Sequence, residues 1–145
     1  MTISSKSLSK VVIMLILVSF NLNVSMIDGE VDFPQRYTVH VTMQNKLPDM
    51  QQLGIHCKDR THDLGFKVVP AGQSWTFYFS PGIINTALFF CSFNWYEGGG
   101  VHRFDIYDAD RDGGVCDQCT WDIHNDGLCR VTGTGAPRCF HYKGE

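Results

Sequence analysis

The stretch that decides the fold covers residues 74–96, SWTFYFSPGIINTALFFCSFNWY. Trp75, Phe77 and Phe79 occupy alternate positions at its start, and a Ser-Pro-Gly sequence ends that run. Residues 86–96 are nearly all apolar or aromatic. A period of two indicates a β-strand, and a strand that is apolar on both faces is typical of the centre of a sheet. The stretch therefore predicts two strands, the second of which lies in the middle of a sheet.

Short runs of the same kind continue on both sides of this stretch. Turn-forming Gly, Pro, Asn and Asp residues separate them. The additional predicted strands cover residues 37–43, 53–58, 101–107, 119–123, 128–132 and 139–142, and residues 66–69 form a further short apolar run. Short strands at this spacing are typical of an all-β fold. We predict a small antiparallel β-sandwich of about eight short strands, stabilised by disulfides.

The N-terminal segment has the order of a secretory signal peptide. Two lysines precede an apolar run over residues 11–20, and small or polar residues follow it. The run has ten residues, whereas spanning a bilayer takes roughly 20. We therefore predict a signal peptide over residues 1–25, with cleavage after Ser25 or as late as Gly29. The mature protein is then secreted and does not insert into a membrane.

The rest of the chain has the size and composition of one domain, which we place at residues 37–145. Apolar residues make up 43% of the sequence and include ten Phe, which supplies enough side-chain volume for one core. The formal net charge is −3, and removing the leader with its two lysines and no acid brings it to −5 (−3 minus 2). A negative protein gains nothing from the counterion release that drives binding to nucleic acid, so we predict no nucleic-acid partner.

The region that follows the predicted leader contains every cysteine of the chain. An even number of cysteines in a short exported chain is typical of a disulfide framework. Several pairings are compatible with the sequence, and spacing alone leaves the choice open. The cysteines are Cys57, Cys91, Cys116, Cys119, Cys129 and Cys139.

Part of the cysteine pattern also fits a zinc knuckle. Three cysteines and one histidine, in the order Cys116-x2-Cys119-x4-His124-x4-Cys129, could close a tetrahedral zinc site. Zinc knuckles bind nucleic acid and are basic, whereas three aspartates make this segment acidic, and an oxidising compartment competes for the thiols. We favour disulfides, predict no metal and no cofactor, and keep a metal-binding protein as an alternative.

Two further patterns suggest chemistry. The segment Asp108-x-Asp110-x-Asp112-Gly113 opens like a calcium-binding loop, but a cysteine stands where the bidentate carboxylate belongs. Two histidines could serve as acid and base in a secreted hydrolase or ribonuclease, yet no Gly-x-Ser-x-Gly motif or paired-histidine signature occurs. We predict a protein that is not an enzyme and keep the hydrolase as an alternative. The histidines are His40, His56, His62, His102, His124 and His141.

Five short motifs follow one another across the domain. They are His56-Cys57-Lys58 with Asp63-Leu64-Gly65, Trp75-x-Phe77-x-Phe79, Leu88-Phe89-Phe90-Cys91-x-Phe93-x-Trp95, Phe104-x-Ile106-Tyr107, and Cys119-x-Trp121-x-Ile123 with Asp126-Gly127-x-Cys129. In this order they resemble the plant S-protein homologues, which are related to the stigma self-incompatibility proteins of poppy. The resemblance covers residues 37–129.

This resemblance implies a secreted, non-enzymatic β-sandwich that acts as an extracellular ligand or signal. In poppy-type members the partner is a membrane protein on pollen. A cell-surface receptor or membrane protein is therefore the expected partner, and pollen–pistil self-incompatibility is the expected process. Four cysteines match positions that such proteins use for two bridges, namely Cys57, Cys91, Cys119 and Cys129. We expect a third bridge between Cys116 and Cys139.

We expect the recognition surface in three loops between strong strands, at residues 59–65, 97–103 and 108–114. All three are polar and rich in glycine or charge, and the acidic third loop suggests a basic patch on the partner. The candidate contact residues are Asp59, Arg60, His62, Asp63, Glu97, His102, Arg103, Asp108, Asp110 and Asp112. A glycosylation sequon begins at Asn23, within the predicted cleavage region.

Overall fold

A computed structural model of the chain describes residues 5–24 and 37–144. The chain divides into two units: Met1–Gln35, which contains helix α1 (Ser5–Val24), and Arg36–Glu145, which contains all the strands described below. Within the described ranges, no helix combines the length and the apolar character that crossing a membrane requires. The two predicted cleavage sites and the last residue of the Asn23 sequon lie outside the described residues, so both stay predictions.

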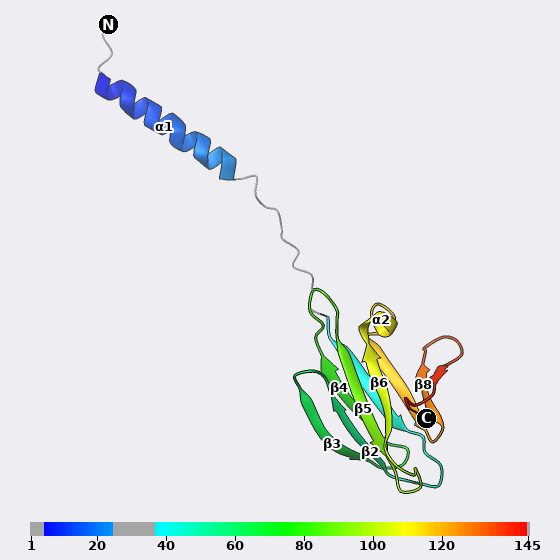
Figure 1. Ribbon diagram of the computed structural model, residues 1–145. Helices are drawn as coiled ribbons and strands as arrows, with labels where there is room; N and C mark the ends of the chain where they lie inside the picture. Colours follow the sequence, from blue (N-terminus) through cyan, green and yellow to red (C-terminus); the bar gives the residue numbers. More distant parts are fainter. Residues whose placement is uncertain (1–4, 25–36, 145) are drawn as a thin grey trace. The chain divides into compact units, whose positions relative to one another are not determined.

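Two sheets form the second unit (Figure 1). Sheet A has the order β4-β1-β7-β8-β9, with β4 (Ser74–Phe79), β1 (Val39–Asn45), β7 (Gln118–His124), β8 (Gly127–Val131) and β9 (Arg138–Phe140). Sheet B has the order β3-β2-β5-β6, with β3 (Asp63–Val69), β2 (Leu53–Lys58), β5 (Leu88–Asn94) and β6 (His102–Asp108). The predicted all-β sandwich is confirmed, with nine strands in the described part of the chain.

One pair of neighbouring strands departs from the antiparallel prediction. Strands β1 and β7 are parallel, with Val41 opposite Cys119 and Met43 opposite Trp121. Parallel neighbours need a long connection, and here the segment from β2 to β6 supplies it. Strands β2, β3, β5 and β6 build sheet B, and β4 pairs with the other side of β1. A short helix, α2 (Ala109–Asp112), also forms between β6 and β7 where the sequence predicts only a loop.

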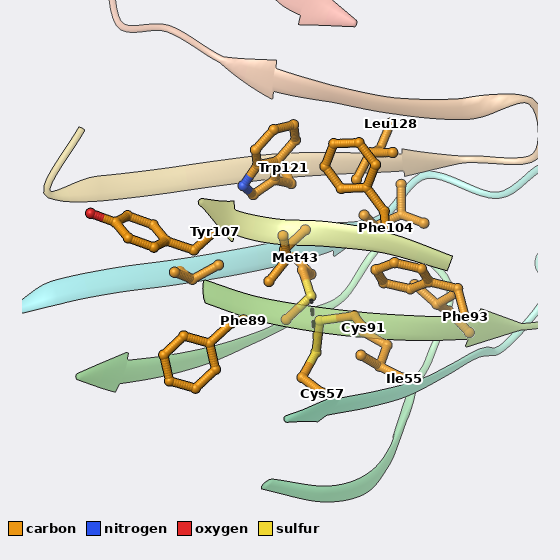
Figure 2. Packing of buried hydrophobic residues seen from close by; sticks show 14 of the residues in the cluster. Met43, Ile55, Cys57, Phe89, Cys91, Phe93, Phe104, Tyr107, Trp121 and Leu128 are labelled. Atoms are coloured by element: carbon orange, nitrogen blue, oxygen red, sulfur yellow. Dashed lines mark hydrogen bonds between the residues drawn. A yellow bond between two sulfur atoms is a disulfide. The ribbon is translucent and has the colours of Figure 1, made fainter. Parts of the chain in front are cut away.

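The core lies between the two sheets and follows the alternation of the sequence (Figure 2). Val39, Val41 and Met43 of β1 are fully buried, and Phe93 of β5 and Trp121 of β7 face the same interior. Each such side chain contributes about 1.5–3 kcal/mol to folding by leaving water. The period of two in the sequence therefore determines which side chains face the interior between the sheets, as expected for a sandwich.

The predicted interior position of the strand within residues 86–96 is confirmed, since β5 lies between β2 and β6. Only one of its faces is covered, however. Phe89, Cys91 and Phe93 are buried, whereas Leu88 and Phe90 on the other face remain accessible to solvent. Apolar residues on both faces thus correctly predicted a strand with neighbours on both sides, although only one face of this strand is packed against the other sheet.

The disulfides differ in part from the predicted pairing. The structure contains Cys57–Cys91, Cys116–Cys119 and Cys129–Cys139, so the expected bridge between Cys116 and Cys139 is wrong. The four cysteines that the resemblance assigned to two bridges form only one bridge among themselves, Cys57–Cys91. Strand order gives the reason. Cys139 lies in β9, and Cys116 lies just before β7. These strands are two positions apart in sheet A, which is about 10 Å at the usual strand spacing. Cysteines whose Cα atoms are more than about 7 Å apart cannot be bridged without moving the backbone.

Candidate recognition surface

Strand direction separates the predicted recognition loops between two ends of the sandwich. Strands β2 and β6 are both antiparallel to β5, so they finish at the end where β5 begins. The segments at that end are residues 59–62, 80–87, 109–117 and 132–137, which we call the acidic end (Figure 1). Residues 46–52 and 95–101 lie at the opposite end, which we call the tyrosine end after Tyr96. Two of the three predicted loops therefore share one end, and the loop that contains Glu97 does not.

The connection between β2 and β3 is a tight polar turn built around Asp59. Its Oδ1 accepts hydrogen bonds from the backbone N–H groups of Thr61 at 2.8 Å and of His62 at 2.6 Å. Burial opposes ionisation of this carboxyl group, but these bonds and the His62 ring outweigh it and lower the pKa of Asp59. Asp59 therefore holds the turn, while Arg60 and His62 project into solvent.

Asp63 belongs to strand β3, so the predicted loop at 59–65 is shorter than expected. The Gly65 N–H donates to Asp63 Oδ1 at 2.8 Å, and His56 Nε2 of the neighbouring strand lies 2.6 Å from the same oxygen. The Gly65 N–H and then the His56 ring lower the pKa of this exposed carboxyl group. Asp63 is thus accessible from solvent but already bonded within its own hairpin.

The second acidic segment has one buried carboxylate. Asp108 caps helix α2, because its Oδ1 accepts from the Asp110 N–H at 3.0 Å, and Asp110 is exposed. Asp112 is fully buried and accepts from Arg111 Nη2 at 2.6 Å, from Arg130 Nη1 and from the Asp108 N–H. The prediction that Asp112 is a contact residue is therefore wrong, since solvent and partners cannot reach it.

Aromatic rings enclose the arginine next to Asp112. The Arg111 guanidinium lies over the rings of Phe104, Trp121 and Phe140, at 4.9, 5.0 and 5.3 Å from their centres. Its Nη2 also donates to the Asp105 carbonyl at 2.8 Å. Cation–π contacts of this kind are strongest where water is excluded. Helix α2 is thereby fixed to the core, and the carboxylates of its segment do not converge as in a calcium loop.

The metal alternatives find no support in the geometry of the described residues. All six cysteines are bonded in disulfides, so no thiolate is left for the zinc knuckle. Across residues 5–24 and 37–144, no group of three or more His, Cys, Asp or Glu side chains is close enough to hold a metal ion.

At the tyrosine end, two predicted loop residues belong to a strand instead. His102 and Arg103 open β6. The His102 ring stacks on Trp95, with centres 4.4 Å apart and 15° between the planes, and its Nε2 lies 2.8 Å from the Gly98 carbonyl oxygen. His102 therefore packs against the base of the loop, whereas Glu97 and Arg103 are exposed.

The most exposed aromatic residue at this end was not predicted. Tyr96 is 98% exposed and Met50, on the neighbouring loop, is 83% exposed. Gln51 and Glu97 join the two loops, through Glu97 N–H to Gln51 Oε1 at 3.1 Å and Gln51 Nε2 to Glu97 Oε2 at 3.3 Å. The alternation that buries Trp95 already predicts an outward Tyr96. Met50 has a left-handed backbone, φ 57°, which no sequence pattern here indicates.

The acidic end carries an exposed apolar pair that was also missed. Ile83 and Ile84 are 95% and 80% exposed in the connection between β4 and β5. The next residue anchors them, because Asn85 Nδ2 donates to the Tyr107 hydroxyl at 3.1 Å and to the Tyr37 hydroxyl at 3.3 Å. Burial raises the pKa of Tyr107 despite this bond. Two adjacent isoleucines after a Pro-Gly turn are a sequence signal that could have drawn attention to this loop.

The histidines of the hydrolase alternative are spread over the molecule. His56 and His62 share the β2–β3 hairpin, and each contacts its own aspartate. His124 ends β7, and His141 follows β9, so both lie toward the tyrosine end with His102. His40 lies near the start of β1, opposite Gln118 and therefore nearer the acidic end.

Comparison with known proteins places the chain in a family. The model of the family described as plant self-incompatibility protein S1 matches residues 40–143. The chain belongs to this family of self-incompatibility S1 proteins and S-protein homologues. S-protein homolog 5 of Arabidopsis thaliana is 48% identical over 103 residues, which cover 71% of this chain and 77% of that protein. S-protein homolog 3 of the same plant is 38% identical over 123 residues, covering 82% and 79%.

A solved structure has the same fold. It is an SPH (Self-Incompatibility Protein Homologue) protein, from what is described as a widespread family of small, highly stable, secreted proteins from plants. The TM-score is 0.54 at 13% sequence identity, and the match covers 74% of this chain and 96% of that one. At this identity the likeness concerns the fold alone, and it supports the sandwich.

Proposed function

We propose that this chain is a secreted, non-enzymatic signalling ligand that binds a protein on the surface of another cell, as in pollen–pistil self-incompatibility. Membership of the family supports the process, and the N-terminal sequence supports secretion. The six cysteines, all in disulfides, suit an oxidising extracellular compartment. The sandwich is then a rigid support for loops that make the contact.

The observation that carries this proposal is the exposed isoleucine pair at the acidic end. Ile83 and Ile84 point from an anchored loop at the same end as Arg60, His62 and Asp110. An apolar centre with polar residues around it is the usual anatomy of a protein interface, and most of the binding energy comes from the centre. The aspartates at this end favour a partner with a basic patch, which speeds encounter.

A binding assay with matched variants at the two ends tests this proposal. The labelled, secreted wild-type protein is titrated onto pollen and onto vegetative protoplasts. We expect Ile83→Ser/Ile84→Ser to weaken binding by at least about tenfold, because the apolar centre is lost. The control, Tyr96→Ser/Met50→Ser, removes a similar apolar pair from the tyrosine end and is expected to bind like the wild type.

The outcomes of this assay separate the two ends. Loss of binding in the control alone would move the contact to the tyrosine end. Equal binding by all three proteins would contradict recognition through these loops. A milder change, Asp110→Asn, is expected to slow association and to reduce its dependence on salt, because rim charges act mainly on the rate of encounter.

A further inference from the structure

The two sheets have four edges, and three of them carry features that block further strand pairing. Strand β9 has only three residues. The segment after β9 covers part of the edge of β6, because the Lys143 N–H donates a hydrogen bond to the Arg103 carbonyl at 2.8 Å. Strand β3 carries Asp63 and Lys67, and its pairing with β2 is irregular. Short length, cover, charge and bulges are the usual means of protecting an edge.

The strand at the fourth edge, β4, has none of these features in its own sequence, although a charge lies nearby on Lys67 of β3, whose Nζ is 5.8 Å from the centre of the Trp75 ring. Its sequence is SWTFYF, six residues without a charge, a proline or a glycine. Its register with β1 is regular from Val39 opposite Phe79 to Gln44 opposite Ser74. Within the described part of the chain, β1 is the only strand that pairs with it. A flat, uncharged edge of this kind is ready to accept another strand.

The backbone groups that face outward along β4 follow from the pairing pattern. The Asn45 N–H donates to the Gln73 carbonyl at 2.9 Å, which sets the phase of the β1–β4 ladder. Hydrogen-bonded residues alternate along an antiparallel pair, so Trp75, Phe77 and Phe79 bond to β1. The N–H and C=O groups of the other three residues, Ser74, Thr76 and Tyr78, point away from β1. None of the backbone hydrogen bonds found in residues 37–144 uses them.

We propose that β4 is a self-association edge, on which a second copy of this chain pairs through its own β4. The strands run antiparallel about a two-fold axis at Thr76, so that Ser74 of one copy lies opposite Tyr78 of the other. In this register all three outward-facing residues of each copy exchange both of their hydrogen bonds. The two five-stranded sheets A then join into one continuous sheet.

The side chains of β4 favour this register. On the outer face, Tyr78 is 73% exposed and meets the small Ser74 of the other copy, which leaves room for the ring. Thr76 already lies 2.8 Å, oxygen to oxygen, from Thr42, and the axis extends this row with a second Thr76. On the inner face, the half-buried Trp75 meets Phe77 of the other copy. Aromatic and threonine pairs across strands are favourable.

Self-complementarity is why a second copy is the occupant. In a two-fold interface, the same patch of both subunits makes the contact. A charged side chain near the axis would therefore lie close to the identical charge of the other copy and be repelled. The strand has no charge to repel in this way, although the chain as a whole has a formal net charge of −3. Six uncharged residues therefore stand at the one unprotected edge of a charged protein.

Sedimentation velocity of the full secreted protein, from micromolar to near-millimolar concentration, tests the proposal. The wild type is expected to shift from monomer to dimer. Thr76→Lys places two like charges opposite each other across the axis and is expected to raise the dimer dissociation constant at least about tenfold. The matched control is Thr120→Lys, on the same face of sheet A but on β7, two strands farther in.

Amide hydrogen exchange gives a second readout that depends on the strand itself. In a dimer of this geometry, exchange at Thr76 and Tyr78 slows as concentration rises, while exchange at Thr120 does not change. Near-ultraviolet circular dichroism establishes that each variant is folded. A wild type that is monomeric at every concentration overturns the proposal, and so does equal dimerisation of Thr76→Lys and Thr120→Lys.

Discussion

The two acidic segments at one end of the sandwich look alike in sequence and differ in structure. In the β2–β3 hairpin, Asp59 and Asp63 are bonded to their own turn and stay at the surface. In the segment around α2, Asp112 is fully buried between Arg111 and Arg130. The comparison teaches that the partners of a carboxylate, and not the composition of its loop, decide whether it faces solvent.

The largest effect is expected from removing the buried carboxylate. Asp112→Ala leaves Arg130 buried without its partner, and breaking a buried pair costs about 3–5 kcal/mol of the free energy of unfolding. Urea denaturation measures this loss. Asp110→Ala, two residues away and exposed, is the control and should change stability by less than about 0.5 kcal/mol. Similar losses for both variants would contradict the structural difference between them.

The two disulfides near these segments should also contribute unequally to the free energy of unfolding. Cys57–Cys91 joins β2 of the first hairpin to β5 and spans 34 residues of sequence, whereas Cys116–Cys119 follows α2 and spans three. Loop-closure entropy predicts a loss of about 4 kcal/mol for Cys57→Ala/Cys91→Ala and of about 1.5 kcal/mol for the double alanine variant of the short bridge. Thermal unfolding of the two variants measures the difference, and a reversed order would contradict the entropic explanation.

The surface aspartate that holds the first turn should matter less. Asp59→Ala removes hydrogen bonds to the N–H groups of Thr61 and His62, which can turn to water instead. The expected loss is about 1 kcal/mol, the usual net value of such bonds. Asp59→Asn retains an acceptor oxygen and should recover part of it. A loss as large as that of Asp112→Ala would mean that the hairpin is not the local, solvent-exposed unit described above.

The smallest effect is a pH dependence that belongs to the first segment. The pKa values of Asp59 and Asp63 are lowered from 3.8, so the unfolded chain takes up protons first as pH falls. Their contribution is therefore complete above pH 3.8 and is lost as pH falls through the folded values. Asp59→Asn/Asp63→Asn should lose this contribution above pH 3.8, so that stability falls less steeply as pH is lowered and approaches that of the wild type at the acid end, measured by denaturation at successive pH values.

Those parts of the fold that depend on local alternation could be predicted from the sequence. The strand from Leu88 and the buried face of β1 both follow from a period of two, because each residue's face depends only on its neighbours along the chain. Pairing between distant segments has no such local signal. The parallel β1–β7 pair and the Cys129–Cys139 bridge depend on the order of strands in sheet A, which the alternation does not contain.

The candidate surface was predicted in part, and the burial of Asp112 had a signal that was overlooked. Arg130 stands two residues after the buried Leu128, at an inward position of β8. A buried arginine requires a carboxylate partner, and the acidic segment supplies one. Met50 is a different case, because its exposure depends on a turn conformation that the sequence around it does not indicate.

The parallel pair of β1 and β7 has a consequence for the order in which this protein is made. Strand β1 is the first strand to emerge during synthesis, yet one of its two neighbours follows only after sheet B is complete. Sheet B and the Cys57–Cys91 bridge can therefore assemble on a growing chain, whereas β1 waits with one side unpaired. A nascent chain that stops before Gln118 should be prone to aggregation, since unpaired strands in partly folded chains associate.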